Sequence, residues 1–109
     1  MGASLALSDA MQVNLQYQGK WRIKTAEGTV IVIGRPNAGT PVQIDLTPDT
    51  TVSRVHARVW QEGAQWWAED LKSKYGTQFN GQPLKGKTPL TSSDTLQVGE
   101  TTLRFDLPA

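Results

Sequence analysis

The stretch Val52-Ser53-Arg54-Val55-His56 gathers side chains that could do chemistry: a hydroxyl, a guanidinium and the chain's only histidine. Ser53 and His56 are the one serine–histidine pair close in sequence, so nucleophilic catalysis is the first use to consider. The chain has no Gly-x-Ser-x-Gly elbow, and residues three apart on an extended segment point to opposite faces. A Gly-rich phosphate loop is also missing. We therefore expect a protein that is not an enzyme.

Two further polar segments carry residues of the same kind, Gly34-Arg35 and the run from Leu71 to Gly81. Glycine permits a tight turn, and arginine presents a planar fork with several hydrogen-bond donors. An isolated Gly-Arg pair more often does no more than solvate the end of a strand. Each segment alone is a weak signal of function, so we first ask which strands and loops would hold these segments in place.

Short alternating runs, each ended by turn residues, fill most of the chain. From Val55 to Trp60 the side chains alternate between two faces with the period of a β-strand. Asn80-Gly81 is a strong hairpin signal, and no segment has a helical periodicity. Strands at this spacing with polar turns predict an all-β fold, an antiparallel β-sandwich or a barrel. The predicted strands lie near residues 13–17, 21–24, 29–33 (buried on both faces), 42–46, 55–60, 66–71, 95–98 and 102–107.

Length and composition narrow the class of protein. The 109 residues suit one domain, predicted at residues 11–109 after a flexible leader of residues 1–10. Eleven Lys and Arg against ten Asp and Glu give a net charge of +1, which disfavours nucleic acid as the main partner. No cysteine and a single histidine argue against disulfides and metal sites, and we expect no cofactor. No apolar run is long enough to span a membrane, so we expect no membrane partner and a cytoplasmic location.

Taken together and in this order, the three polar segments resemble the motifs of the forkhead-associated (FHA) domain. The family pattern is Gly-Arg, then Ser-x-x-His, then Ser-x-Asn-Gly-Thr-x-x-Asn-Gly. The matching residues are Gly34-Arg35, Ser53-Arg54-Val55-His56, and Ser73-Lys74-Tyr75-Gly76-Thr77-Gln78-Phe79-Asn80-Gly81. The likeness extends over roughly residues 12–107.

The resemblance implies a β-sandwich of about eleven short strands whose loops at one end bind phosphothreonine in a partner protein. A phosphate carries about −1.5 to −2 charge and three strong acceptor oxygens, so it needs fixed donors and no acid nearby. The three motif segments contain no Asp or Glu and hold Arg35, Arg54 and Lys74. We therefore expect a locally basic site.

The family's roles carry over residue by residue. The resemblance assigns phosphate binding to Arg35, Ser53, Ser73 and Lys74, and contact with the peptide to Thr51, Val52, Arg54 and Tyr75. It assigns bracing of the loops, without contact to the phosphate, to Gly34, His56, Gly76, Thr77, Asn80 and Gly81.

One position departs from the family pattern. Tyr75 replaces the usual asparagine, and a tyrosine cannot reproduce an amide that both donates and accepts. Trp60 and Trp66 are candidates for partial exposure, although we favour packing in the core or on a sheet face. These features keep an alternative open, a phospho-independent FHA-like interaction or oligomerisation module.

Overall fold

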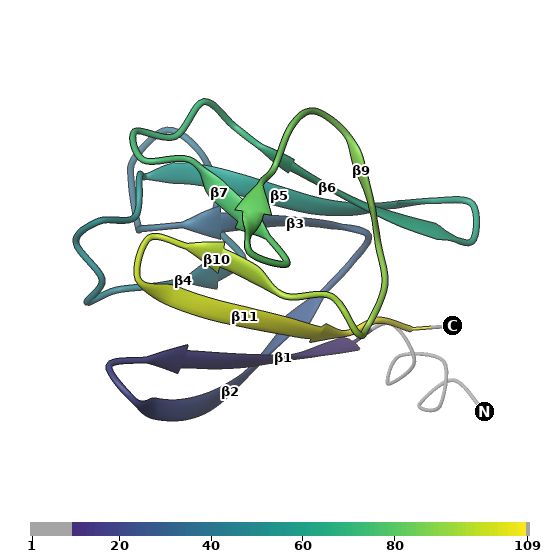
Figure 1. The fold of residues 1–109 in the computed structure, drawn as a ribbon, viewed down its shortest axis with the longest axis horizontal. Helices are drawn as coiled ribbons and strands as arrows, with labels where there is room; N and C mark the ends of the chain where they lie inside the picture. The colour runs from purple at the N-terminus through teal and green to yellow at the C-terminus, as the bar shows by residue number, and fades with distance from the viewer. Residues whose placement is uncertain (1–9, 109) are drawn as a thin grey trace.

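The computed structural model describes residues 10–108, which form eleven strands in two packed sheets (Figure 1). The predicted leader, residues 1–10, lies outside the described residues except for Ala10, the first residue of β1. The strands are β1 (Ala10–Tyr17), β2 (Lys20–Glu27), β3 (Val30–Gly34), β4 (Ile44–Asp45), β5 (Val55–Glu62), β6 (Gln65–Asp70), β7 (Thr77–Phe79), β8 (Gln82–Pro83), β9 (Thr88–Leu90), β10 (Leu96–Val98) and β11 (Thr101–Asp106).

The two sheets have the strand orders β2-β1-β11-β10-β7-β8 and β4-β3-β5-β6-β9. Every pair is antiparallel except β3 with β4, which is parallel. The inner faces meet in one core, to which Leu15, Leu103 and Phe105 contribute from one sheet and Ile31 and Val59 from the other. The predicted all-β sandwich is confirmed.

Two predicted strands differ in detail from the structure. β3 was expected to be buried on both faces, but Val30 is 50% exposed while Ile31 is fully buried. The strand therefore alternates in the ordinary way, because the outer face of its sheet is open to solvent. The alternating run at 42–46 forms only the two-residue β4, whose parallel register places Ile44 beside Ile33.

The tryptophans of the central hairpin lie in packed positions. Trp66 is 3% exposed and faces the core, and Trp60 is 7% exposed on the outer face of the sheet. Arg58 lies 4.2 Å from the centroid of the Trp60 ring, and Lys87 lies 4.4 Å from that of Trp67. The prediction that Trp60 and Trp66 pack in the core or on a sheet face is confirmed. Neither side chain forms an exposed apolar surface for a partner.

The connections that carry the motifs lie at one end of the sandwich. The loops after β3, β4 and β6 and the turn between β10 and β11 gather on the left in Figure 1, away from both chain ends. The strands beneath are rigid, so these loops start from fixed positions. In residues 10–108 no helix is long and apolar enough to cross a membrane.

Candidate functional site

Gly34 and Arg35 lie where β3 runs closest to the chain entering β5. A Cβ atom on Gly34 would lie 2.1 Å from the carbonyl oxygen of Arg54, so only glycine fits there. The Arg35 amide donates to that same oxygen at 3.1 Å. The Arg35 Nε donates to the Val52 carbonyl at 2.6 Å, and the other guanidinium nitrogens form no hydrogen bond within residues 10–108. The guanidinium is thus held at one edge, and its terminal nitrogens remain available to a ligand.

His56 joins two of the loops from a fully buried position. Its Nδ1 accepts a hydrogen bond from the Ser53 amide at 3.0 Å. Because Nδ1 accepts, the ring proton of the neutral imidazole is on Nε2, which donates to the Gly76 carbonyl at 2.9 Å. The loop before β5 is thereby linked to the loop before β7.

Ser53 makes a second link between the same two loops. Its Oγ accepts a hydrogen bond from the Lys74 amide at 3.0 Å. The hydroxyl proton has no acceptor among residues 10–108, so it can still be donated to a ligand. The Lys74 side chain is exposed, and its Nζ lies 5.4 Å from the centroid of the Tyr75 ring.

An acid lies close beside the third motif segment, although the motif segments themselves contain none. Asp70, at the end of β6, accepts from the Ser73 hydroxyl at 2.6 Å, from the Ser73 amide at 3.0 Å and from the Thr77 hydroxyl at 2.7 Å. It also lies 4.0 Å from Nε2 of His56. Burial alone raises the pKa of Asp70, but the hydrogen bonds from Ser73 and Thr77 outweigh burial and lower it. Motif matching missed Asp70 because it precedes the third segment, although the Asp-x-x-Ser spacing is a sign of such a turn.

Ser53 and Ser73, both expected to bind phosphate, therefore differ in what their hydroxyls can do. Ser53→Ala is expected to weaken phosphopeptide binding by about tenfold or more, because one donor to a charged group is lost. Ser73→Ala is expected to lower the free energy of unfolding by about 1–2 kcal/mol and to affect binding less, because its hydroxyl proton already goes to Asp70. Titration calorimetry and urea unfolding of the two variants check this pair. If Ser73→Ala lost as much binding as Ser53→Ala while its stability stayed unchanged, Ser73 would instead contact the phosphate directly.

The residues expected to contact the peptide differ in exposure. The side chains of Arg54 and Tyr75 are exposed, Tyr75 at 66%. The Val52 side chain is 1% exposed and belongs to the core, so only its main chain is left to face a ligand. The Thr51 hydroxyl is committed to a hydrogen bond with Asp49 at 2.5 Å.

Asp49 is a residue of this end that motif reading did not identify. It is fully buried, and one carboxylate oxygen accepts from the amide and hydroxyl of Thr51. The other accepts from the Glu100 amide and the Thr101 hydroxyl, both at 2.8 Å. Burial alone raises the pKa of Asp49, but the hydrogen bonds from Thr51, Thr101 and Glu100 outweigh burial and lower it. Asp49 therefore ties the loop before β5 to the β10–β11 turn, and the Asp-x-Thr spacing was its sequence signal.

Asp49→Asn is expected to lower the free energy of unfolding by about 2–3 kcal/mol near neutral pH, since an amide presents a donor to groups that are themselves donors. Because folding lowers the pKa of Asp49, its contribution is fully present above the ordinary value of 3.8 and is lost as the pH falls below it. Urea unfolding from neutral to acid pH should show the difference between the two proteins shrinking once the pH falls below 3.8. A constant difference across that range would show that the carboxylate charge contributes nothing.

The remaining glycine and asparagine positions shape turns around the loops. Asn80 and Gly81 form the two-residue connection between β7 and β8, both with positive φ, as the hairpin signal predicted. The Asn80 side chain also accepts from the Thr95 amide and donates to Asp94. Gly76 has a φ of 80° and presents its carbonyl to His56. Asn37, absent from the motifs, closes the loop after β3 with bonds to Arg35, Gly39 and Thr40.

A two-sheet all-β sandwich with three braced loops at one end is the architecture of FHA domains, and comparison with known proteins gives the same result. The FHA domain family model matches residues 31–99. The chain belongs to the FHA family.

Two relatives are similar over part of their length. The chain is 34% identical over 77 residues to protein FraH of Nostoc sp., covering 66% of this chain and 27% of FraH. It is 30% identical over 95 residues to an oxoglutarate dehydrogenase inhibitor of Corynebacterium jeikeium, covering 72% of this chain and 65% of the inhibitor. The chain thus spans less than two thirds of either relative.

Solved FHA domains superpose over most of the chain. One, from a structural and functional study of phosphothreonine-dependent FHA domain interactions, is 30% identical with a TM-score of 0.69 and covers 88% of this chain and 96% of its own. The FhaA FHA domain, in complex with the intracellular domain of Rv3910, is 28% identical with a TM-score of 0.71 and covers 87% and 98%. FHA domains are modules of protein–protein interaction known for phosphopeptide recognition, and this chain has their fold and motifs.

Proposed function

We propose that this domain binds a partner protein through a phosphorylated threonine held by the loops after β3, β4 and β6. The observation that carries the proposal is the fixed donor set around Ser53. Arg35 is anchored through Nε to the Val52 carbonyl, and the Ser53 hydroxyl is held by the Lys74 amide with its proton still available. The two acids beneath these loops already accept hydrogen bonds, Asp70 from Ser73 and Thr77 and Asp49 from Thr51 and Thr101. A dianionic phosphate is the ligand class that such donors suit best.

The residue roles in this proposal follow from the available atoms. Arg35 and Ser53 contact the phosphate, with the exposed Lys74 side chain adding charge. Arg54 and Tyr75, both exposed, contact the peptide around the phosphothreonine. His56, Gly34, Gly76, Thr77, Asn80 and Gly81 keep the loops in place, and Ser73 joins them through Asp70.

The expected affinity is moderate. Two or three charge-assisted hydrogen bonds at about 1.5–3 kcal/mol each give a gross gain of roughly 3–9 kcal/mol. Contacts to the peptide around the phosphothreonine add to this gain, while association and ordering of the peptide offset part of it, and we expect a dissociation constant in the micromolar range.

Selection from a degenerate phosphothreonine peptide library, compared with the same library without phosphate, tests the proposal. Enrichment of phosphorylated sequences with defined flanking residues is the expected result. The alternative, a phospho-independent interaction or oligomerisation module, has one supporting observation, the largely exposed Tyr75 beside Lys74. Equal recovery from both libraries would favour that alternative over ours. The sequence also predicts a cytoplasmic domain that binds no nucleic acid, membrane, metal or cofactor, and these expectations stay predictions.

A further inference from the structure

A second surface lies on the edge strand β2, outside the three motif segments. β2 pairs with β1 on one side only, so the backbone groups on its other side are unpaired within residues 10–108. Trp21 and Ile23 on this strand are 60% and 64% exposed. An exposed edge with large apolar side chains is a template for pairing with another extended chain.

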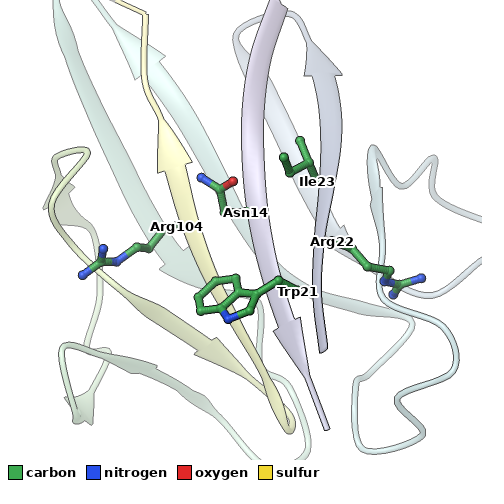
Figure 2. Close-up of a pocket in the computed structure, with 5 residues that line it drawn as sticks. All are labelled: Asn14, Trp21, Arg22, Ile23 and Arg104. Carbon is green, nitrogen blue, oxygen red and sulfur yellow. The ribbon is translucent and has the colours of Figure 1, made fainter. Parts of the chain in front are cut away.

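The outer face beside this edge is hollowed. Asn14, Trp21, Arg22, Ile23 and Arg104 line a hollow of about 530 Å³ (Figure 2). Ile23, Asn14 and Arg104 are direct neighbours across β2, β1 and β11, and they lie on one face with Trp21. Figure 2 shows the Trp21 ring reaching across β1 toward β11, while Arg22 points to the other side. The hollow thus combines the apolar side chains of Trp21 and Ile23 with the polar Asn14 and two arginines, Arg22 and Arg104.

The charges of β2 determine what can pair with it. Lys20, Arg22 and Lys24 share one side of the strand, and none of them forms an ion pair with another of the described residues. Lys24 donates to the Asp45 carbonyl at 2.7 Å, and the Asp45 carboxylate lies near enough to Lys24 and Arg22 for both cations to help lower its pKa, although neither forms an ion pair with it. Glu27 on β2 and Asp106 on β11 lie near the end of β2 that is opposite Trp21. The edge near Trp21 is therefore basic.

This charge pattern opposes pairing with a second copy of the chain in the registers centred on residues 21–24, which would pair the exposed Trp21 and Ile23. Opposed residues of antiparallel strands lie on the same face, so a twofold axis must pass through a residue position. An axis at Ile23 places Arg22 opposite Lys24, and an axis at Lys24 places that lysine opposite its own copy. Lysines on an edge strand also prevent it from pairing with the edge of another copy. That role does not explain why the large apolar side chains of Trp21 and Ile23 are exposed beside them.

We infer that β2 takes an extended acidic segment of a partner protein as an added strand. Alternate acidic residues of that segment lie beside Lys20 and Arg22, and its apolar residues lie on the other face against Trp21 and Ile23. The inference is independent of phosphothreonine binding, because none of these residues belongs to the motif loops.

The probe is a short capped peptide in which Glu alternates with Val around one central Phe, titrated into ¹⁵N-labelled domain and followed by amide shifts. We expect saturable shifts confined to β2 and its neighbours on β1 and β11, with a dissociation constant of about 0.1–1 mM that rises with salt. Two control peptides are used. One has the same composition with all Glu residues in one block, and the other has Lys in place of every Glu. Each should bind at least about fivefold more weakly than the alternating peptide.

Trp21→Ser and Arg22→Glu should each weaken the alternating peptide at least about fivefold while leaving phosphothreonine peptide binding unchanged. Val30→Ser, at a comparably exposed apolar position on the other sheet, is the matched control and should have no effect. The inference is overturned if the alternating peptide does not bind, binds no better than the two control peptides, or shifts the motif loops instead. It is also overturned if sedimentation shows a dimer that Trp21→Ser dissociates, since β2 would then belong to a second copy.

Discussion

Arg35→Ala is expected to weaken phosphothreonine peptide binding by about 100-fold or more. The guanidinium is the cation best placed to neutralise the phosphate, and the loss of two charge-assisted hydrogen bonds costs roughly 3–6 kcal/mol. Arg35→Lys should recover part of the affinity, because lysine keeps the charge but cannot present the planar fork. Titration calorimetry of the three proteins with one phosphopeptide measures the effect.

Stability should respond to Arg35→Ala far less than binding does. The variant loses the hydrogen bond from Nε to the Val52 carbonyl, worth about 1 kcal/mol, which lowers the melting temperature by roughly 4–8 °C. Arg104→Ala is the matched control, because Arg104 is an exposed arginine on β11 outside the motif loops. Binding retained in Arg35→Ala, or lost equally in Arg104→Ala, would remove Arg35 from the phosphate site.

His56→Ala is expected to reduce stability and binding together. The Ser53 amide and the Gly76 carbonyl would lose their partner in a fully buried place, and the missing ring would leave a cavity. Such losses cost about 2–4 kcal/mol, or roughly 10–20 °C in melting temperature. Binding should fall even at temperatures where the variant remains folded, because Ser53 is no longer held toward Lys74.

Two readouts separate this positioning role from a direct contact. His56→Asn, which can replace one of the two hydrogen bonds, should recover part of both the melting temperature and the affinity. Amide spectra of the folded variant should show changes in both the loop before β5 and the loop before β7. A variant with an unchanged melting temperature and no binding would instead make His56 a ligand of the phosphate.

The sequence predicted the fold because its two strongest signals are local. Alternation over Val55–Trp60 and the Asn80-Gly81 turn depend on neighbouring residues alone, and both are found in the structure. β4 was overestimated because its length depends on a parallel partner far along the chain. The β-branched run of β3 predicts burial on both faces, because such a run does not show that Val30 lies on an open face.

The motifs also pointed to the three loops that meet at one end of the sandwich, but not to the acids beneath them. Asp70 and Asp49 lie outside the matched segments, and each takes hydroxyl protons that sequence reasoning had left free. Which hydroxyl faces a ligand and which faces a carboxylate depends on side-chain geometry, as Ser53 and Ser73 show. The surface on β2 was missed because Trp21 alternates like any strand residue, and only the strand order makes β2 an edge.

The most direct test of phosphothreonine recognition is calorimetry with one selected peptide in three forms, carrying phosphothreonine, phosphoserine or unmodified threonine. We predict a micromolar dissociation constant for the phosphothreonine form, weaker binding of the phosphoserine form and no measurable binding of the unmodified peptide. Equal affinity for the phosphorylated and unmodified peptides would contradict the proposed function.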